Sequence, residues 1–220
     1  KDMNNTNWAT IEMVGEESDY VRTLHQAIQP FVEKVKGLIP TSYFRSFCDK
    51  FAAAFTKSYY ESLIRQKRIS ESGTQQLLLD VYNIKTLLLK LPVIETKAAV
   101  GNSVPSMMMQ SRPAGSTIAP AIYTKMVTKQ FARIEILLKL VGTPSELLID
   151  VFKAQWSGGS ALDLQTVMNL KGMKRQEQTT MLEKFGVDPD TAMRGAAAGA
   201  SGTSMTEHVQ ALQGKGSDVA

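Results

Sequence analysis

The side chains that could catalyse a reaction are few and scattered in this chain of 220 residues. The chain has two histidines, His25 and His208, and one cysteine, Cys48, at widely separated positions. Nucleophilic and acid–base catalysis require such groups within hydrogen-bond reach of one another, and one cysteine permits no internal disulfide. We therefore interpret His25 and Cys48 as packing residues on apolar helix faces rather than as catalytic residues.

The chain also lacks the short motifs that position phosphates, metal ions or activated nucleophiles. It contains no G-x-x-x-x-G-K-S/T, no G-x-G-x-x-G, no H-E-x-x-H and no G-x-S-x-G. No alternation of strands and helices is present to host such a motif. We predict that the protein is not an enzyme and that it holds no cofactor and no metal ion.

Two short basic clusters are the features best suited to bind a charged partner. They cover residues 65–68, Arg-Gln-Lys-Arg, and residues 171–175, Lys-Gly-Met-Lys-Arg, and both lie at predicted helix ends. Cations are favoured at helix C-termini, so each cluster indicates either helix capping and solvation or an anionic partner or membrane surface. The net charge is only +4, and the aromatic residues lie on apolar stripes rather than between basic residues. Nucleic acid is therefore not expected as a partner.

The element that organises the chain is a predicted helix over residues 74–91. On a helical wheel, its apolar residues fill about half the circumference: Leu77, Leu78, Val81, Tyr82, Ile84, Leu88, Leu89 and Leu91. The opposite side holds Gln75, Gln76, Asp80, Asn83, Thr86 and Lys90, together with Leu79 and Leu87. An arc this wide predicts a helix with neighbours on two sides, in an all-helical layer.

Lys85 falls inside this apolar arc. Its stem could lie on the leucines while its ammonium group reaches water, or the ammonium group could form a buried ion pair or contact a partner.

Six further helices are predicted, over residues 16–38, 41–65, 118–142, 143–156, 160–170 and 174–185. Pro30 interrupts the first and indicates either a bent helix or two short ones. Thr41 or Ser42 is expected to cap the second helix, and Thr143 and Ser160 are expected to cap two of the later ones. The second helix carries an aromatic stripe whose members we assign to the core: Phe44, Phe47, Cys48, Phe51, Phe55, Tyr59 and Leu63.

The pattern predicts five parts. Residues 1–15 form a leader, whose apolar residues are expected to pack only if upstream chain is present. The sequence starts at Lys1 rather than at Met, which suggests a fragment of a longer polypeptide. Residues 16–92 form a first helical bundle, 93–117 a flexible linker loop, 118–187 a second helical bundle and 188–220 a disordered low-complexity tail. The linker is assigned from its length and its proline, glycine and serine content, and it includes Met107, Met108 and Met109.

Four sequence blocks carry a resemblance to a known family: IPTSYFRSFCDKFAAAF at 39–55, SGTQQLLLDVYNIKTLLLKLP at 72–92, YTKMVTKQFARIEILLKLVGTP at 123–144 and LKGMKRQEQTTMLEKF at 170–185. In this order they resemble the C-terminal region of the Vps-fifty-three subunit of the Golgi-associated retrograde protein complex, over residues 20–185. The most specific parts are the leucine-rich run ending in Leu91-Pro92 and the pattern L-K-G-x-x-x-x-E-Q.

The resemblance implies a non-catalytic subunit of a vesicle-tethering complex of the helical-rod class, which acts in transport from endosomes to the trans-Golgi network. It implies partners among the other subunits of the complex, with SNAREs, small GTPases or the vesicle membrane as further partners. It also implies a peripheral location on the cytosolic face of the trans-Golgi network and endosomes. The expected fold is all-α, with two tandem helical bundles. The alternative is a helical module that binds anionic lipid or nucleic acid.

Five residues are candidate partner contacts. Leu79 and Leu87 are expected to be exposed apolar residues, and Lys171, Lys174 and Arg175 form a basic cluster. Tethers of this class assemble through N-terminal coiled coils, whereas no heptad pattern in this chain outlasts about three repeats. We therefore expect this region to be dispensable for assembly of the complex and to contact a vesicle, a SNARE or a small GTPase.

Overall fold

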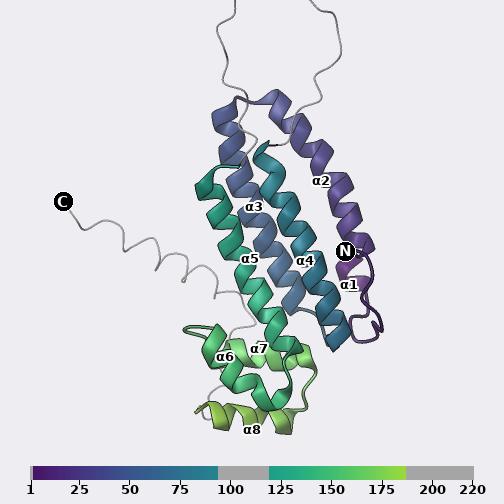
Figure 1. The fold of residues 1–220 in the computed structure, drawn as a ribbon, viewed down its shortest axis with the longest axis vertical. Helices are drawn as coiled ribbons and strands as arrows, with labels where there is room; N and C mark the ends of the chain where they lie inside the picture. The colour runs from purple at the N-terminus through teal and green to yellow at the C-terminus, as the bar shows by residue number, and fades with distance from the viewer. Residues whose placement is uncertain (1, 94–118, 187–220) are drawn as a thin grey trace, which may run out of the picture. The chain divides into compact units, whose positions relative to one another are not determined.

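The computed structural model describes residues 2–93 and 119–186, and within these residues the all-α prediction is confirmed (Figure 1). They form eight α-helices and two short 3-10 helices, and no strand. They divide into two compact units, a first unit that ends at Thr143 and a second unit that begins at Pro144. The tail at 188–220 and all of the predicted linker except Val93 lie outside the described residues.

The first unit is built on four long helices. α1 spans Asp2–Asn5, α2 Asp19–Leu38, α3 Thr41–Ile64, α4 Glu71–Lys90 and α5 Ala121–Gly142, with the 3-10 helix η1 at Leu91–Val93. α2 and α5 lie at opposite edges of the unit in Figure 1, with α3 and α4 between them. α2 continues through Pro30 as one helix, and the residue that precedes α3 as its N-cap is Pro40, not Thr41 or Ser42.

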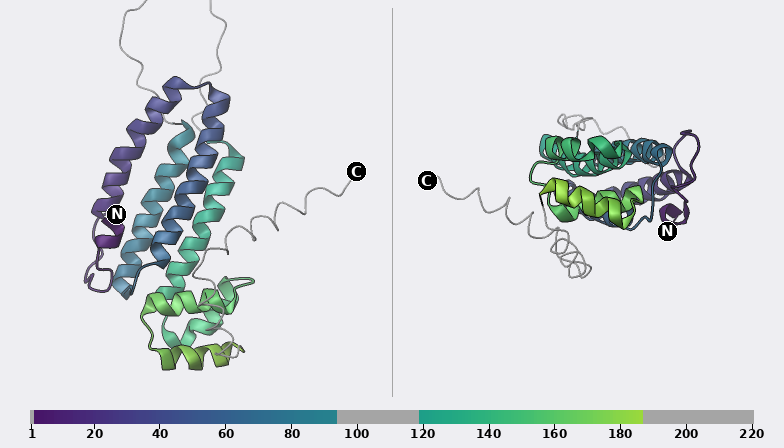
Figure 2. Two further views of the ribbon diagram at one scale, coloured as in Figure 1. Left: turned by 180° about the vertical axis from the view of Figure 1, so that it is seen from behind. Right: turned by 90° about the horizontal axis from the view of Figure 1, so that it is seen from below.

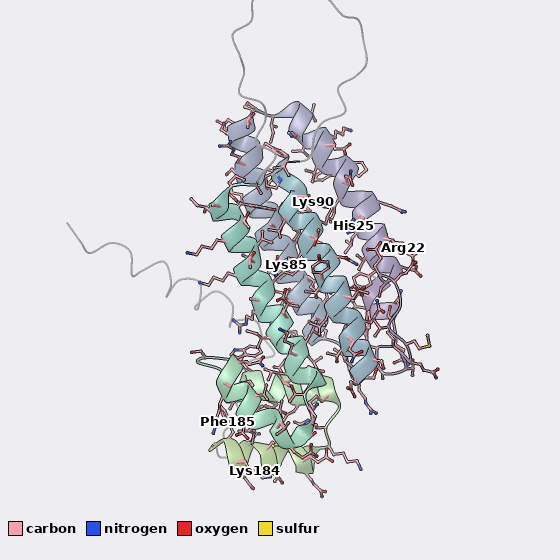
Figure 3. The ribbon with its side chains drawn as sticks, in the orientation of Figure 1. Arg22, His25, Lys85, Lys90, Lys184 and Phe185 are labelled. Carbon is pink, nitrogen blue, oxygen red and sulfur yellow. The ribbon has the colours of Figure 1, made fainter. Side chains whose placement is uncertain are left out.

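α5 packs along α4, and this contact changes the expected domain division. A buried stripe on α5 faces the interior: Tyr123, Val127, Phe131, Ile134, Leu138 and Val141. The Tyr123 hydroxyl donates to the Leu88 carbonyl oxygen at 2.6 Å, and Lys85 Nζ lies 2.9 Å from Glu135 Oε1 (Figure 3). The division therefore lies after Thr143 and not at 93–117, because the wide apolar arc of α4 is covered by the helix that follows the long connection.

The N-terminal residues pack on this unit, which differs from the expectation for a leader. Trp8 is 1% exposed, and its ring meets Tyr20 edge-on at a centroid distance of 6.2 Å. Its carbonyl oxygen accepts hydrogen bonds from Ser70 N at 3.0 Å and Ser70 Oγ at 2.9 Å. Ser70 also caps α4 by accepting from Gly73 N. The aromatic ring and the cap together anchor residues 3–8 without any upstream chain.

Two polar side chains of α4 are buried, although the helical wheel assigned them to the polar side. Asp80 is fully buried and accepts a hydrogen bond from Ser18 N at 2.9 Å. Gln76 Oε1 accepts from Gly15 N at 3.1 Å, and Gln76 Nε2 donates to the Glu16 carbonyl oxygen at 2.8 Å. These side chains replace the backbone partners that the segment before α2 lacks, so they hold the chain where it enters α2.

Within residues 144–186, the second unit has three short helices and a 3-10 turn: η2 Ser145–Leu147, α6 Leu148–Gln155, α7 Ala161–Lys171 and α8 Arg175–Phe185. Ser160 caps α7 as predicted, and it forms a reciprocal capping box with Asp163. Thr143 is not the N-cap of the next helix but the C-cap of α5, because Pro144 is followed by the 3-10 turn and α6 begins only at Leu148. Gly172 and Gly186 adopt left-handed conformations, with φ of 71° and 92°, and end α7 and α8.

Candidate interaction surfaces

The described residues provide little chemistry for catalysis. Among them, no group of three or more histidine, cysteine, aspartate or glutamate side chains is placed to hold a metal ion. Cys48 is buried on α3, and burial, reinforced by the nearby Asp49 carboxylate, raises the pKa of its thiol to about 11. The thiol is therefore protonated near neutral pH and is a weak nucleophile. No helix in 2–93 or 119–186 is both long enough and apolar enough to cross a membrane.

A buried pair of tyrosines lies beside the Asp80 network. The hydroxyl oxygens of Tyr20 on α2 and Tyr59 on α3 are 3.0 Å apart. Burial raises the pKa of both phenols, and for Tyr20 the charges of Tyr59 and Asp80 raise it further. These hydroxyls remain protonated and join α2 to α3, which is a structural role.

The two leucines predicted as exposed contacts on α4 are not exposed. Leu87 is only 5% exposed, which excludes it as a contact surface, and Leu79 is half-buried. The large residue that α4 presents to solvent is Tyr82, which is 64% exposed although the wheel placed it in the apolar arc. The reason is that α4 has α5 on one side and both α2 and residues 15–18 on another, so part of its polar side is covered.

The basic residues Lys171, Lys174 and Arg175 are brought together at the turn between α7 and α8. Lys171 lies in the last turn of α7, where a cation is favoured by the helix dipole. Lys174 and Arg175 are exposed and occupy the N-cap and first position of α8, where a cation is disfavoured. The helix dipole therefore explains the position of Lys171 but not the positions of Lys174 and Arg175.

An exposed apolar surface that the sequence interpretation missed lies where α2 meets α3. It consists of Phe31, Leu38 and Tyr43, with exposed fractions of 51%, 73% and 68%, and we name it the α2–α3 surface. Phe31 also contacts Phe47 of the aromatic stripe at a centroid distance of 6.1 Å. Phe31 and Leu38 belong to the apolar spacing of three and four residues that predicts the helix over residues 16–38. Their place after Pro30 could not have separated them, because Val32 also follows Pro30 and is fully buried; their exposure arises because α2 lies at an edge of the unit (Figure 2).

Comparisons with known proteins match the chain to one family. Residues 75–173 match the family described as "Vacuolar protein sorting-associated protein 53 C-terminus", and this range includes residues of both units. No solved structure matches the chain significantly.

Three curated relatives carry the same name. The chain is 30% identical over 178 residues to vacuolar protein sorting-associated protein 53 A of Arabidopsis thaliana, covering 81% of this chain and 19% of that protein. It is 29% identical over 185 residues to the Caenorhabditis elegans homolog, covering 81% of this chain and 21% of that protein. It is 30% identical over 118 residues to protein 53 B of Arabidopsis thaliana, covering 53% of this chain and 18% of that protein. The chain thus spans about a fifth of the length of the relatives it matches.

Proposed function

We propose, from the membership of this chain in the family of vacuolar protein sorting-associated protein 53 C-terminal regions, that it is a non-catalytic part of a multisubunit vesicle-tethering complex. The complex proposed is the Golgi-associated retrograde protein complex, acting in transport from endosomes to the trans-Golgi network. The observation that carries this proposal is the similarity over 81% of the chain to proteins named for vacuolar protein sorting. The location proposed is peripheral, on the cytosolic face of the trans-Golgi network and endosomes.

The contrast between the buried reactive side chains and the exposed apolar and basic side chains supports a binding role. The described side chains with unusual environments, Cys48, Tyr20, Tyr59 and Asp80, are buried; the two tyrosines join α2 to α3, and Asp80 holds the segment before α2. The features that reach solvent are instead an apolar surface and basic clusters, which suit contact with other macromolecules. The partners proposed are other subunits of the complex, with a SNARE, a small GTPase or the vesicle membrane as a further partner.

Two surfaces are proposed to make these contacts. The first is the α2–α3 surface, because it exposes large apolar side chains on an edge helix. The second is the cluster Lys171, Lys174 and Arg175, because two of its cations lie at the positive end of α8. Leu79 is retained as a minor contact.

The proposal is tested by deleting residues 20–185 from the full-length protein in cells. Co-precipitation of the partner subunits and recycling of an endosome-to-Golgi cargo receptor are then measured. We expect the complex to persist while the receptor is missorted. Loss of the complex, or normal recycling, contradicts the proposal.

Surface variants separate a binding defect from a loss of folded structure. Leu38→Glu combined with Tyr43→Ser changes the α2–α3 surface, and Ile122→Glu is the matched control because Ile122 is 86% exposed at the start of α5. We expect receptor missorting with the first variant and normal recycling with the control. Equal missorting with both variants would remove the α2–α3 surface from the proposal.

A helical module that binds anionic lipid is the second candidate, and the position of Lys174 and Arg175 at the start of α8 favours it. Charge reversal at Lys171, Lys174 and Arg175 tests it by sedimentation of the chain with anionic liposomes. Tight binding that vanishes in this variant would favour the lipid module over the tether.

A further inference from the structure

The basic cluster at residues 65–68 lines a cavity of the first unit. The cavity has a volume of about 430 Å³ and lies between the end of α3 and the N-terminal residues. Its lining consists of Asn4, Asn5, Thr6, Asn7, Trp8, Ala9, Arg65, Gln66, Lys67 and Arg68. The volume falls within the range of roughly 300–1,000 Å³ that is usual for small-ligand sites.

Both walls of this cavity are held in place by hydrogen bonds of their own residues. Gln66 Nε2 donates to Asn4 Oδ1 at 2.8 Å and to the Ser62 carbonyl oxygen at 2.9 Å, which joins the N-terminal segment to the end of α3. At the other end of the segment, the Trp8 carbonyl oxygen accepts from Ser70, and the Trp8 ring is buried. The cavity is therefore a feature of the folded unit, formed before any ligand arrives.

The lining carries three cations and no carboxylate: Arg65, Lys67 and Arg68. The ion pairs between Arg22 and Asp19 and between Lys85 and Glu135 form elsewhere. The helix dipole accounts for Arg65, which is the C-cap of α3, whereas Lys67 and Arg68 lie beyond the last turn. Three like charges around one cavity make its potential positive, which attracts an anion.

A neighbouring cavity in the same unit shows that this charge is specific to one site. That cavity has a volume of about 320 Å³ and no charged residue in its lining, which is Met3, Asn4, Tyr20, Thr23, Leu24, Phe55, Ser58, Tyr59 and Ser62. Asn4 borders both cavities, so they are neighbours, but the second is lined by residues of α2 and α3 and lacks the basic residues at the end of α3.

We propose that the cavity between residues 4–9 and 65–68 binds a phosphorylated inositol ring, either the headgroup of a phosphoinositide lipid or a soluble inositol phosphate. Arginine matches phosphate oxygens with its planar fork of N–H donors, and lysine adds a point charge. One phosphate ion would fill only part of about 430 Å³. The asparagine amides lining the rest can donate to and accept from ring hydroxyl groups.

The proposal does not depend on the tethering function and is tested with the purified chain. The probes are phosphatidylcholine vesicles containing a phosphatidylinositol monophosphate, matched vesicles in which phosphatidylserine supplies the same surface charge, and soluble inositol trisphosphate. The variant replaces Arg65, Lys67 and Arg68 with glutamine. The control makes the same charge change on α5, with Lys125, Lys129 and Lys139 replaced by glutamine, because these three lysines are exposed and outside the cavity.

A second variant, Asn5→Asp, adds a carboxylate to the lining without touching the cations. We expect affinity for the phosphoinositide vesicles to fall by about fivefold for each cation removed, and by a comparable factor in Asn5→Asp. The α5 control is expected to retain most of its affinity for the phosphoinositide vesicles. Since all of the substituted side chains are exposed and lie outside the core, thermal melts should remain close to that of the unchanged chain.

The arms of the experiment distinguish the source of the ligand. Binding of vesicles and of inositol trisphosphate supports the site for a lipid headgroup, and binding of inositol trisphosphate alone supports it for a soluble ligand. Equal binding to phosphatidylserine vesicles, equal losses in the cavity variants and the α5 control, or no binding to any probe would overturn the proposal. So would binding of an oligonucleotide in place of the inositol probes.

Discussion

The helices of the second unit carry their own start and stop signals, whereas those of the first unit are held by contacts between segments far apart in the sequence. α7 begins at a serine capping box and ends at a left-handed glycine, and α8 also ends at one. In the first unit, α2 begins where Asp80 and Gln76, about sixty residues later, hold the preceding segment. Local signals thus specify where short helices lie, and distant contacts specify which face of a long helix is buried.

The largest expected effect in this comparison is at the core of α4. Leu88 is fully buried, so Leu88→Ala should lower the free energy of unfolding by about 2–5 kcal/mol. The exposed Lys90, two residues later, is the control, and Lys90→Ala should cost under about 0.5 kcal/mol. Chemical denaturation measures both. Similar losses in the two variants would mean that α4 does not form the core of the unit.

The next largest effect is expected from substitution of the buried Asp80 carboxylate. Asp80→Ala leaves the Ser18 amide without its acceptor, and we expect a loss of about 1.5–3 kcal/mol in unfolding free energy. Asp80→Asn retains an acceptor oxygen and should lose much less. Asp49→Ala is the control, because Asp49 is exposed on α3. Hydrogen exchange at the start of α2 should rise in Asp80→Ala alone, and unchanged exchange there would show that the contact does not hold the segment.

Two glycines of the first unit are expected to respond in opposite directions. A Cβ added at Gly73 would collide with the Trp8 carbonyl oxygen, so Gly73→Ala should cost about 1–3 kcal/mol by displacing the N-terminal segment. A Cβ at Gly37, inside α2, meets nothing within 4 Å, and Gly37→Ala should stabilise by about 0.5–1 kcal/mol. Denaturation midpoints and Trp8 fluorescence measure the pair. A stable Gly73→Ala variant with an unchanged spectrum would contradict this packing.

A smaller effect is expected from the local signals of the second unit. Ser160→Ala removes the cap of α7 and should cost about 0.5–2 kcal/mol. Ser157→Ala, at an exposed position before the helix, is the control. Hydrogen exchange by mass spectrometry should show faster exchange in residues 161–164 of the capping variant. If exchange in α4 rises equally, the loss is not local to the second unit.

The smallest expected effect is a loss of stability of the first unit at alkaline pH. The pKa of the Cys48 thiol rises from 9.0 to about 11 on folding, so the folded state binds more protons between these values. Stability should therefore fall as pH rises through 9.0 and level off above about 11. Burial also raises the pKa of Tyr20, Tyr59 and Tyr123, which extends the loss to higher pH.

The second unit tests this prediction within the same molecule. Residues 144–186 contain neither tyrosine nor cysteine, so hydrogen exchange in that unit should change little over the same pH range. Cys48→Ala should flatten the first part of the fall in the first unit. An identical pH response in both units would contradict the assignment to these buried groups.

Much of the secondary structure could be predicted because its signals are local. The helix expected at 41–65 is observed at Thr41–Ile64, and the caps at Ser160 and Gly172 lie where the sequence indicated. The candidate surfaces were predicted less well. Lys171, Lys174 and Arg175 do lie together, since they are neighbours in the chain, but Leu87 is buried and the α2–α3 surface was not predicted.

The amino-acid sequence by itself determined the helical class, the positions of most helices and the family resemblance, because periodicity, caps and sequence motifs are local features of the chain. Tertiary structure alone decided that α5 completes the first unit, that Asp80 and Gln76 are buried, and that residues 4–9 meet the basic cluster at 65–68. A helical wheel records which side chains share a face, and burial depends on which faces another segment covers. That choice is made by contacts between residues distant in sequence, which no local pattern contains.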